Sequence, residues 1–230
     1  MIVSVTDGDS IGIETDAGSF QLRLYGINAP EAEECQGDEA RRWMIANARG
    51  ADIALQDVGI DQFGRTLALV WIGDRLLNLT LVEIGLAIAL GDVEDDRIRE
   101  RLLSAEKVAV AAGVGMWSPE ACGTGPLPPI AITSIDADPP GPDGAALEHE
   151  VVTITNIGDT AVEISGWTLR DESSANRYRF PPETLLDPGA EIKVDSGETG
   201  FASGSPVWNN EGDMAILVDA NGRFVSRLRY

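Results

Sequence analysis

Positive charge is scarce in this chain of 230 residues. It has 17 lysines and arginines against 38 aspartates and glutamates, so its formal net charge is −21. Only Lys107 and Lys193 are lysines. A field of this sign repels polyanions and works against affinity that rests on phosphate neutralisation alone. Strong acidity with few lysines also favours a saline or extracellular setting, where salt screens the excess charge.

Sulfur and imidazole ligands are nearly absent. The chain has one histidine, His149, and two cysteines, Cys35 and Cys122, all far apart in the sequence. Such a set is a poor zinc site, and we expect His149 to be a surface residue. The cysteines are either unrelated buried thiols or a disulfide that ties the loop after residue 31 to the end of the first domain. We favour the disulfide, because two cysteines that bracket one domain suit an oxidising compartment.

Long apolar runs are missing as well. No stretch of about 18 or more uninterrupted apolar residues occurs, so the sequence predicts no transmembrane helix. No basic segment followed by an apolar one precedes the first expected strand, and we expect no signal peptide in this chain. The apolar fraction of 43% is nevertheless ordinary. The length allows one large domain or two of common size, each with its own core.

The pattern of apolar residues divides the chain in two. Up to residue 117 it predicts five strands and three helices, which fit a small closed barrel of OB type. We expect Asp38 and Asn78 to cap the first two helices. The predicted strands cover 2–5, 10–15, 19–25, 51–55 and 65–72. The predicted helices lie within 37–50, 78–87 and 95–113, where Gly50 stops the first and Gly85 stands just past the end of the second.

The second half has a different texture. Proline, glycine and serine mark a linker at 119–128 between a first domain, 1–118, and a second, 129–230. The second domain shows short β runs with turn signals about every 8–12 residues, which predicts an immunoglobulin-like β-sandwich with Trp167 in its core. The expected fold class is therefore mainly β with some α.

Carboxylates, an amide and arginines gather in short motifs of the first half. Asp9, just after a turn, and Asn28 offer oxygen ligands of the kind that calcium takes. Arg23 and Arg65 can each hold a phosphodiester through two parallel hydrogen bonds and stay charged at any working pH. Glu31 is a carboxylate that can orient or deprotonate a water. Together these are the parts for metal-assisted phosphodiester hydrolysis.

Each motif also has a structural interpretation. "TDGD" is a good turn, and "DQFGR" is a good hairpin signal. Taken one at a time, such motifs are structural more often than catalytic. The sequence by itself leaves open whether their side chains meet.

The order and spacing of the motifs carry more information than any one of them. The motifs are, in chain order, "DGDS", "RLYGINAPE", "GDEA", "DQFGR", "NLTLVEIGLA" and "AEKVAVAAGVGMW". On their order and spacing, the chain resembles the thermonuclease family of staphylococcal-nuclease-like phosphodiesterases, which have an OB fold. The resemblance covers residues 1–117. It implies calcium-dependent hydrolysis of DNA and RNA, with nucleic acid as substrate and Ca²⁺ as cofactor.

The resemblance also implies a role for individual residues at the metal. Asp9 matches the family's principal calcium-ligand aspartate, and Ala29 would lend its backbone carbonyl. Asn28 stands where a second ligand aspartate is usual. A neutral oxygen there lowers cation affinity by removing a direct Coulomb attraction, without preventing ligation.

On the substrate side, Arg23 and Arg65 match the two arginines that hold the scissile phosphate, and Glu31 matches the glutamate assigned to the water. Phe63 falls where the family often has a tyrosine and is the expected substrate-binding aromatic. Gln62 replaces a basic residue, and an acidic loop at 91–96 replaces tyrosines and lysines. That loop removes stacking and adds repulsion.

The second half, 129–230, resembles the lamin-tail domain, an immunoglobulin-like sandwich often appended to secreted nucleases. The resemblance rests on "EHEVVTITNIGDTAVEISGWTLRDE", "LDPGAEIKV" and "VWNNEGDMAILVDANG". It implies a binding or attachment module of unknown partner and a secreted or cell-surface location. Two functions stay open: an active nuclease with an attachment module, and a non-catalytic binding or structural protein that reuses the barrel.

Overall fold

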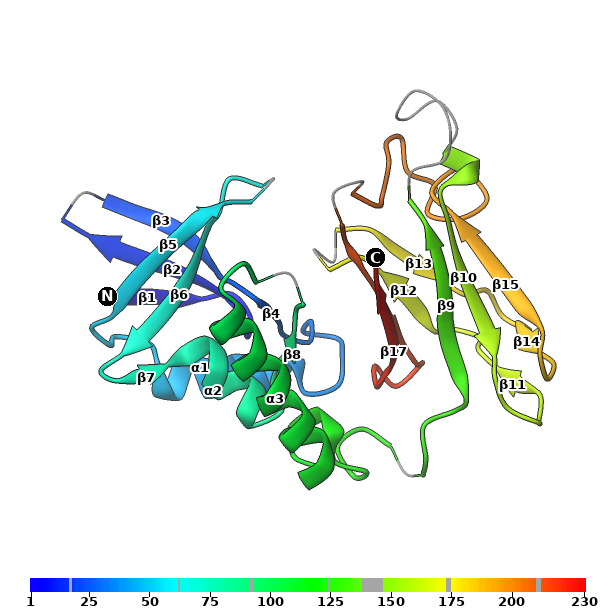
Figure 1. Cartoon of the computed structure of the whole chain (residues 1–230), viewed down its shortest axis with the longest axis horizontal. Coiled ribbons are helices and arrows are strands. Elements are labelled where there is room, and N and C mark those ends of the chain that lie inside the picture. The colour runs from blue at the N-terminus through cyan, green and yellow to red at the C-terminus, as the bar shows by residue number, and fades with distance from the viewer. Residues whose placement is uncertain are drawn as a thin grey trace. The chain divides into compact units, whose positions relative to one another are not determined.

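The structure is a computed structural model of the chain. It describes residues 1–16, 18–61, 63–91, 93–123, 125–137, 147–172, 175–209 and 212–230. The chain forms two compact units, 1–124 and 125–230 (Figure 1). Gln62, Asp92 of the acidic loop and residue 124 of the expected linker therefore lie outside the described residues.

A sheet of six strands is the framework of the first unit. Its long strands follow the order β1-β2-β3-β6-β5, and the short β7 pairs with β6. The pairs are antiparallel except β3 with β6, which are parallel. Alternation buries one side of these strands: Ile11, Ile13 and Leu22 are at most 1% exposed. The strands span Ile2–Val5 (β1), Ser10–Thr15 (β2), Gly18–Leu24 (β3), Ala54–Ile60 (β5), Thr66–Ile72 (β6) and Arg75–Leu76 (β7).

The expected OB-type barrel is only partly closed. Within the described residues, no strand ladder joins β5 to β1. The backbone of Ile2 bonds instead to the segment that leads into β5: the Gly50 N–H donates to Ile2 O at 2.8 Å, and the Ile2 N–H donates to Ala51 O at 3.4 Å. An OB fold is itself a partly open five-stranded barrel. The fold class is confirmed, and full closure is corrected.

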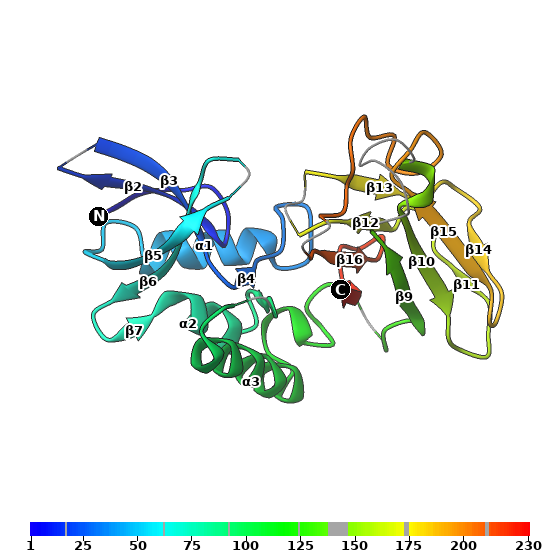
Figure 2. The same cartoon turned by 45° about the horizontal axis from the view of Figure 1, so that its top comes forward.

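Three helices pack beside this sheet (Figure 2). The first begins after Gln36, which is its N-cap, and the expected cap Asp38 lies inside the first turn. The third has Asp95 as its N-cap, whose carboxylate accepts the Arg97 N–H, and Gly113 as its C-cap, in the left-handed conformation with φ 61°. The helices span Gly37–Asn47 (α1), Leu77–Glu83 (α2) and Asp96–Ala112 (α3).

Asn78 is a buried bridge rather than the expected cap of α2. Leu76 is the N-cap, and Asn78 is 0% exposed inside the helix. Its amide oxygen accepts the Val70 N–H at 3.0 Å, and its amide nitrogen donates to the carbonyls of Tyr25 at 2.8 Å and Ala68 at 3.2 Å. A buried amide must have hydrogen-bond partners, and these three bonds to other segments outweigh the preference of asparagine for a helix cap.

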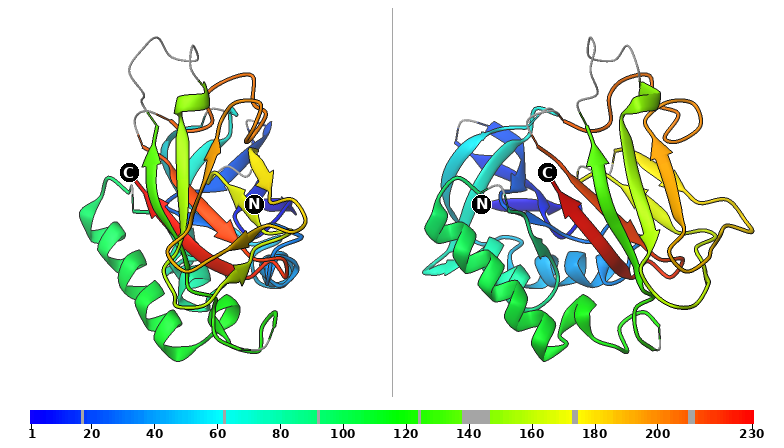
Figure 3. Two further views of the ribbon diagram at one scale, coloured as in Figure 1. Left: turned by 90° about the vertical axis from the view of Figure 1, so that its right-hand side faces the viewer. Right: turned by 45° about the vertical axis from the view of Figure 1, so that its right-hand side comes forward.

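The second unit is a sandwich of two antiparallel sheets, as Figure 3 shows. One has the order β15-β10-β9 and the other β13-β12-β16-β17, while β11 pairs with β14. The strands span Ile130–Asp136 (β9), Val151–Asn156 (β10), Val162–Glu163 (β11), Thr168–Arg170 (β12), Arg177–Arg179 (β13), Leu185–Leu186 (β14), Glu191–Asp195 (β15), Met214–Val218 (β16) and Phe224–Arg229 (β17).

Both sheets of the sandwich contribute to one apolar core. Trp167 is 4% exposed within it, as expected, and Phe180 and Trp208 are each 1% exposed. His149 lies in a short 3₁₀ turn, Leu147–His149, and is exposed, also as expected.

Two short strands complete the first unit, Ile27–Asn28 (β4) and Ile88–Ala89 (β8). None of the helices in the described residues combines the length and hydropathy that crossing a bilayer requires.

A disulfide joins Cys35 and Cys122, whose Cα atoms lie 5.6 Å apart. It ties the loop before α1 to the end of the first unit across a sequence separation of 87 residues. A crosslink of that span restricts the unfolded chain and stabilises the folded one by about 4–5 kcal/mol on the chain-entropy argument.

Removing this crosslink tests its contribution to the first unit. We expect a Cys35→Ser/Cys122→Ser variant to unfold on the order of 10 °C below the oxidised protein, because its unfolded state regains loop entropy. Scanning calorimetry with and without reductant measures this. Reductant should lower the melting temperature of the wild type and leave that of the variant unchanged. If the oxidised wild type and the variant melt at the same temperature, the disulfide does not stabilise the unit.

Asp213 is a buried acid at the start of β16, 7% exposed. Burial first, and then the carboxylates of Glu172 and Asp171, raise the pKa of Asp213 to about 7. The Tyr230 hydroxyl also lies near Asp213, and Glu150 and Arg229 are among the charged groups around that hydroxyl. An unfolded aspartate has a pKa of about 3.9. The folded protein therefore holds the proton of Asp213 more tightly than the unfolded chain does. The resulting stabilisation is complete below about pH 4 and is lost as the pH rises to 7.

An Asp213→Asn variant imitates the protonated acid at every pH. We expect its second unit to melt about 2–4 °C above wild type at pH 8, with the difference closing as the pH falls toward 4. Thermal unfolding at several pH values measures this, with Asp187→Asn, an exposed change in the same unit, as control. A difference that stays constant with pH would refute the assignment.

Candidate functional site

The "DGD" motif forms the turn between β1 and β2. The Asp7 carboxylate accepts the N–H of Asp9 at 3.0 Å and that of the next residue at 2.7 Å. A Cβ on Gly8 would lie 2.6 Å from the Cβ of Ala29 and 2.8 Å from that of Ala40. Atoms cannot approach so closely. Glycine therefore allows the turn to pack directly against the end of β4 and the first turn of α1.

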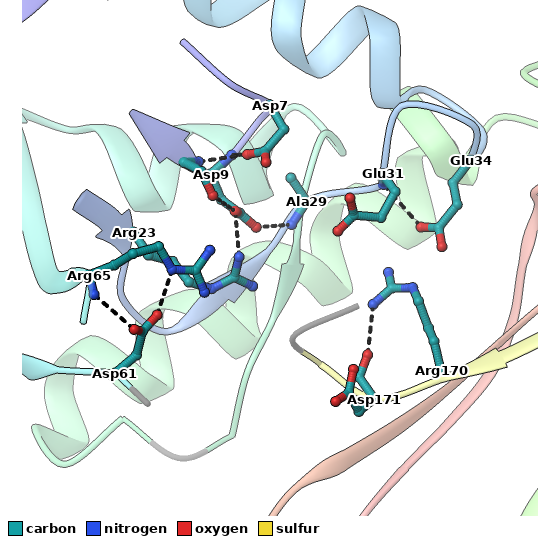
Figure 4. A network of polar contacts seen from close by, with 11 residues as sticks. Asp7, Asp9, Arg23, Ala29, Glu31, Glu34, Asp61, Arg65, Arg170 and Asp171 are labelled. Atoms are coloured by element: carbon teal, nitrogen blue, oxygen red, sulfur yellow. Dashed lines mark hydrogen bonds and ion pairs between the residues drawn. The ribbon is translucent and has the colours of Figure 1, made fainter. Parts of the chain in front are cut away.

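Asp9 is the centre of the site, and Figure 4 shows the hydrogen bonds that its carboxylate accepts. It is 2% exposed. One carboxylate oxygen accepts from Arg23 Nη1 at 2.7 Å and from Ser10 Oγ at 3.1 Å. The other accepts the Ala29 N–H at 2.7 Å. A buried charge is tolerated when it is paired and hydrogen-bonded in this way, so Asp9 holds β2, β3 and the end of β4 together.

Asn28 is the last residue of the short strand β4, and Ala29 follows it. β4 pairs with β8, and Asn28 lies opposite Ile88. Asn28 is 1% exposed and Ala29 is 3% exposed. The peptide between them supplies the N–H that Asp9 accepts. The expected amide and backbone carbonyl therefore come from neighbouring residues, and the Ala29 N–H joins them to the carboxylate of Asp9.

The loop that follows carries Glu31. The Glu31 N–H donates to Glu34 Oε2 at 3.1 Å, and the Glu34 N–H returns a bond to Glu31 O at 2.8 Å. Glu31 is half-buried, and Glu34 is 8% exposed. The next residue is Cys35, so the disulfide fixes this loop at its far end.

Negative charge accumulates around the turn. Burial, with the carboxylates of Asp9 and Glu31, raises the pKa of Asp7 to about 6. The carboxyl groups of Asp7, Asp9 and Glu31 therefore share one electrostatic environment, although "DGD" and "NAPE" are separated in the sequence.

Arg65 sits at the end of a tight turn between β5 and β6. Asp61 Oδ1 accepts the N–H groups of Phe63 and Arg65, both at 2.9 Å, and Asp61 Oδ2 accepts from Arg65 Nε at 2.6 Å. Burial alone would raise the pKa of Asp61, but these bonds hold it below its usual value. The Arg65 guanidinium also lies 5.3 Å from the centre of the Phe63 ring.

Arg23 and Arg65 approach the same region from parallel neighbours. Arg23 on β3 pairs with Leu67 on β6, two positions beyond Arg65. Figure 4 shows both side chains pointing toward the region beside Asp9. Two guanidinium groups there can hold the oxygens of one phosphodiester.

The acidic loop is less repulsive than its composition indicates. Asp95 caps α3 and bonds the Arg97 side chain, and Asp96 pairs with Arg99. The hydrogen bonds from Arg97 lower the pKa of Asp95. Arginines of α3 that sequence reasoning left out thus offset part of this charge.

The structure joins Asp9 to Arg23 and to Ala29 by hydrogen bonds, and Asn28 directly precedes Ala29 in the chain. In the described residues, no three side chains of histidine, cysteine, aspartate or glutamate converge as a metal cluster. Asp61 was absent from the sequence-based set. The signal for it was its place as first residue of the "DQFGR" turn, where a carboxylate accepts backbone N–H groups.

Comparisons with known proteins find a family for each unit. Residues 21–119 match the family described as staphylococcal nuclease homologue, and residues 125–230 match the lamin tail domain. The chain is similar to an uncharacterized endonuclease of Haemophilus influenzae, with 30% identity over 118 residues that cover 51% of this chain and 65% of that protein.

It is also similar to the thermonucleases of Staphylococcus intermedius and Staphylococcus hyicus. Each is 30% identical over 125 residues, which cover 51% of this chain and 74% of the relative. The chain belongs to the staphylococcal nuclease homologues, with a thermonuclease-like nuclease domain in its first unit and a lamin tail domain in its second.

Proposed function

We propose that the first unit hydrolyses phosphodiester bonds of DNA or RNA in a calcium-dependent reaction, and that the second unit is a binding or attachment module. One observation carries the proposal. The buried Asp9 carboxylate bonds both Arg23, a phosphate-binding side chain, and the Ala29 peptide of the metal side. A cation and a phosphate bound by these groups would be immediate neighbours, as metal-assisted phosphoryl chemistry requires.

The residues present suit a hard divalent cation. Calcium takes carboxylate, amide and backbone carbonyl oxygens, which Asp9, Asn28 and Ala29 offer. A carboxylate has about four lone-pair positions, and Asp9 uses three of them in protein hydrogen bonds. Asp9 therefore retains one for a metal. When bound, calcium would supply positive charge next to the scissile phosphate.

The arginines would bind and polarise the phosphodiester. Arg23 is oriented by its Nη1 bond to Asp9, and Arg65 by its Nε bond to Asp61, which leaves both Arg65 Nη atoms beyond that contact. Charge on the phosphoryl oxygens increases in the transition state, so fixed guanidinium groups stabilise it more than the ground state.

Glu31 would act on the water. As the water oxygen forms its bond to phosphorus, Glu31 accepts a proton, and one ester P–O bond breaks with its electrons on the leaving oxygen, which then takes up a proton. The bonds between Glu31 and Glu34 and the neighbouring disulfide keep this loop in place.

Phe63, 53% exposed beside Arg65, would stack on a base of the substrate. The disulfide supports a secreted or cell-surface location.

A Glu31→Gln variant tests this role. We expect cleavage of a single-stranded oligonucleotide in calcium to slow at least about a hundredfold, because the amide cannot accept the proton of the water. Gel-resolved cleavage rates, with chelator as the metal-free reference, measure it.

The matched control is Asp38→Asn, which removes one negative charge from an exposed position at the start of α1. It should retain the wild-type rate. A Glu31→Gln protein that cleaves as fast as the control would rule out this function for Glu31.

An Asn28→Asp variant tests the metal side. A charged ligand adds direct Coulomb attraction, so we expect calcium to bind at least about tenfold more tightly, equivalent to about 1.4 kcal/mol. Calorimetric titration measures it, with Asn47→Asp, the same change at an exposed helix position, as control. Equal affinities for wild type and Asn28→Asp would show that Asn28 is no ligand.

The neutral Asn28 also supports a second candidate, a non-catalytic binding or structural protein on a nuclease fold. Wild-type protein that cleaves no oligonucleotide in calcium at low or high salt, and binds no calcium by calorimetry, would favour this candidate over the nuclease.

A further inference from the structure

The turn that carries Arg65 has a counterpart in the second unit. Residues 219–223, "DANGR", connect β16 to β17 as 61–65, "DQFGR", connect β5 to β6. Asp219 Oδ1 accepts the N–H groups of Asn221 at 2.8 Å and Arg223 at 2.9 Å. Asp219 Oδ2 accepts from Arg223 Nε at 2.7 Å. Each of these bonds has its equivalent in the first turn.

The backbone of the two turns agrees as well. The Asp61 N–H donates to Arg65 O at 2.9 Å, and the Asp219 N–H donates to Arg223 O at 2.9 Å. The glycine before each arginine takes a positive φ, 79° for Gly64 and 75° for Gly222. An aspartate, a glycine and an arginine at the same spacings therefore form the same turn in both units.

The two turns differ in what surrounds the arginine. The third residue is Phe63 in one and Asn221 in the other, and only the Phe63 ring has an arginine guanidinium above it within these turns. Arg65 points toward the region of Asp9 and Arg23 (Figure 4), where the proposed phosphodiester would lie. The same local device thus holds one arginine at the nuclease site and another in the sandwich.

We propose that Asp61 is a positioning residue of the nuclease, which fixes Arg65 through its Nε atom and leaves the two Nη atoms for the phosphodiester. This inference rests on the proposed function. Both side chains of the pair are largely shielded from solvent: 13% of the Asp61 side chain and 24% of the Arg65 side chain are exposed. A paired and partly buried guanidinium has already lost much of its rotamer freedom, so less is lost when the substrate binds.

The charge of Asp61 is part of its role. A carboxylate can accept from Nε on one oxygen and from two backbone N–H groups on the other, as observed. In an Asp61→Asn variant the amide oxygen can keep the backbone bonds, but the amide nitrogen cannot accept from Nε. The turn should survive while Arg65 is released.

The expected effect is on the chemical step. A mobile Arg65 still attracts a phosphate, but it no longer meets the developing charge of the transition state in one geometry. We expect Asp61→Asn to lower kcat about ten- to hundredfold and to change KM by less than about threefold.

The second turn supplies a matched control in the same molecule. Asp219→Asn makes the identical change in an equivalent turn that carries no phosphate-binding arginine. In the full chain, both variants should lose a similar amount of thermal stability, while Asp219→Asn keeps the wild-type kcat and KM. Rates are taken well below the lower melting temperature, so that unfolding does not contribute.

A double mutant separates positioning from general damage. If Asp61 acts through Arg65, then Asp61→Asn should cost nothing further in an Arg65→Ala background. The NMR exchange rate of the Arg65 Nε–H gives a readout that needs no turnover, and it should rise at least about tenfold in Asp61→Asn and stay unchanged in Asp219→Asn.

The outcomes are distinct. Wild-type kcat in Asp61→Asn, or an additive loss in the double mutant, overturns the inference and leaves the proposed function standing. If the wild type itself does not cleave, the proposed function fails, and the Nε–H exchange then decides: faster exchange in Asp61→Asn supports the positioning of Arg65, and unchanged exchange refutes it.

Discussion

One buried carboxylate joins the segments that form the site of the first unit. Asp9 is almost inaccessible to solvent, and an unpaired charge there would cost several kcal/mol. Arg23, Ser10 and the Ala29 N–H satisfy it from three segments. That need explains Gly8, which lets the turn close on Ala29. The fold is thereby organised around a negative charge that already faces an arginine.

Arg65 shows how an ordinary turn can serve a reactive site. The Asp61 turn and the Asp219 turn have the same hydrogen bonds, so the Asp–Arg pair is explained by local backbone chemistry alone. Function enters through where the hairpin ends and what lies nearby. In the nuclease unit the arginine points toward the region beside Asp9 (Figure 4); in the sandwich the same turn joins β16 to β17.

Periodicity and turn chemistry predicted much of this from the sequence. The alternating strands, the helix ending at Gly113 and the core position of Trp167 follow from local patterns. Asn78 did not, because buried carbonyls and an N–H from other segments outweighed its capping preference. Asp61 was also missed, since a carboxylate in a turn has a sufficient structural reason to be there. The meeting of Asp9 with Ala29 is a tertiary contact that neither motif specifies alone.

If Asp9 holds calcium, then removing its carboxylate removes the calcium site. Calorimetric titration of the chelator-treated wild type, of Asp9→Ala and of the exposed control Asp38→Ala compares the same chain with and without the central carboxylate, with circular dichroism to show that each is folded. The account predicts a calcium site in the wild type and in the control that is lost in folded Asp9→Ala. Equal calcium binding by all three proteins would contradict it.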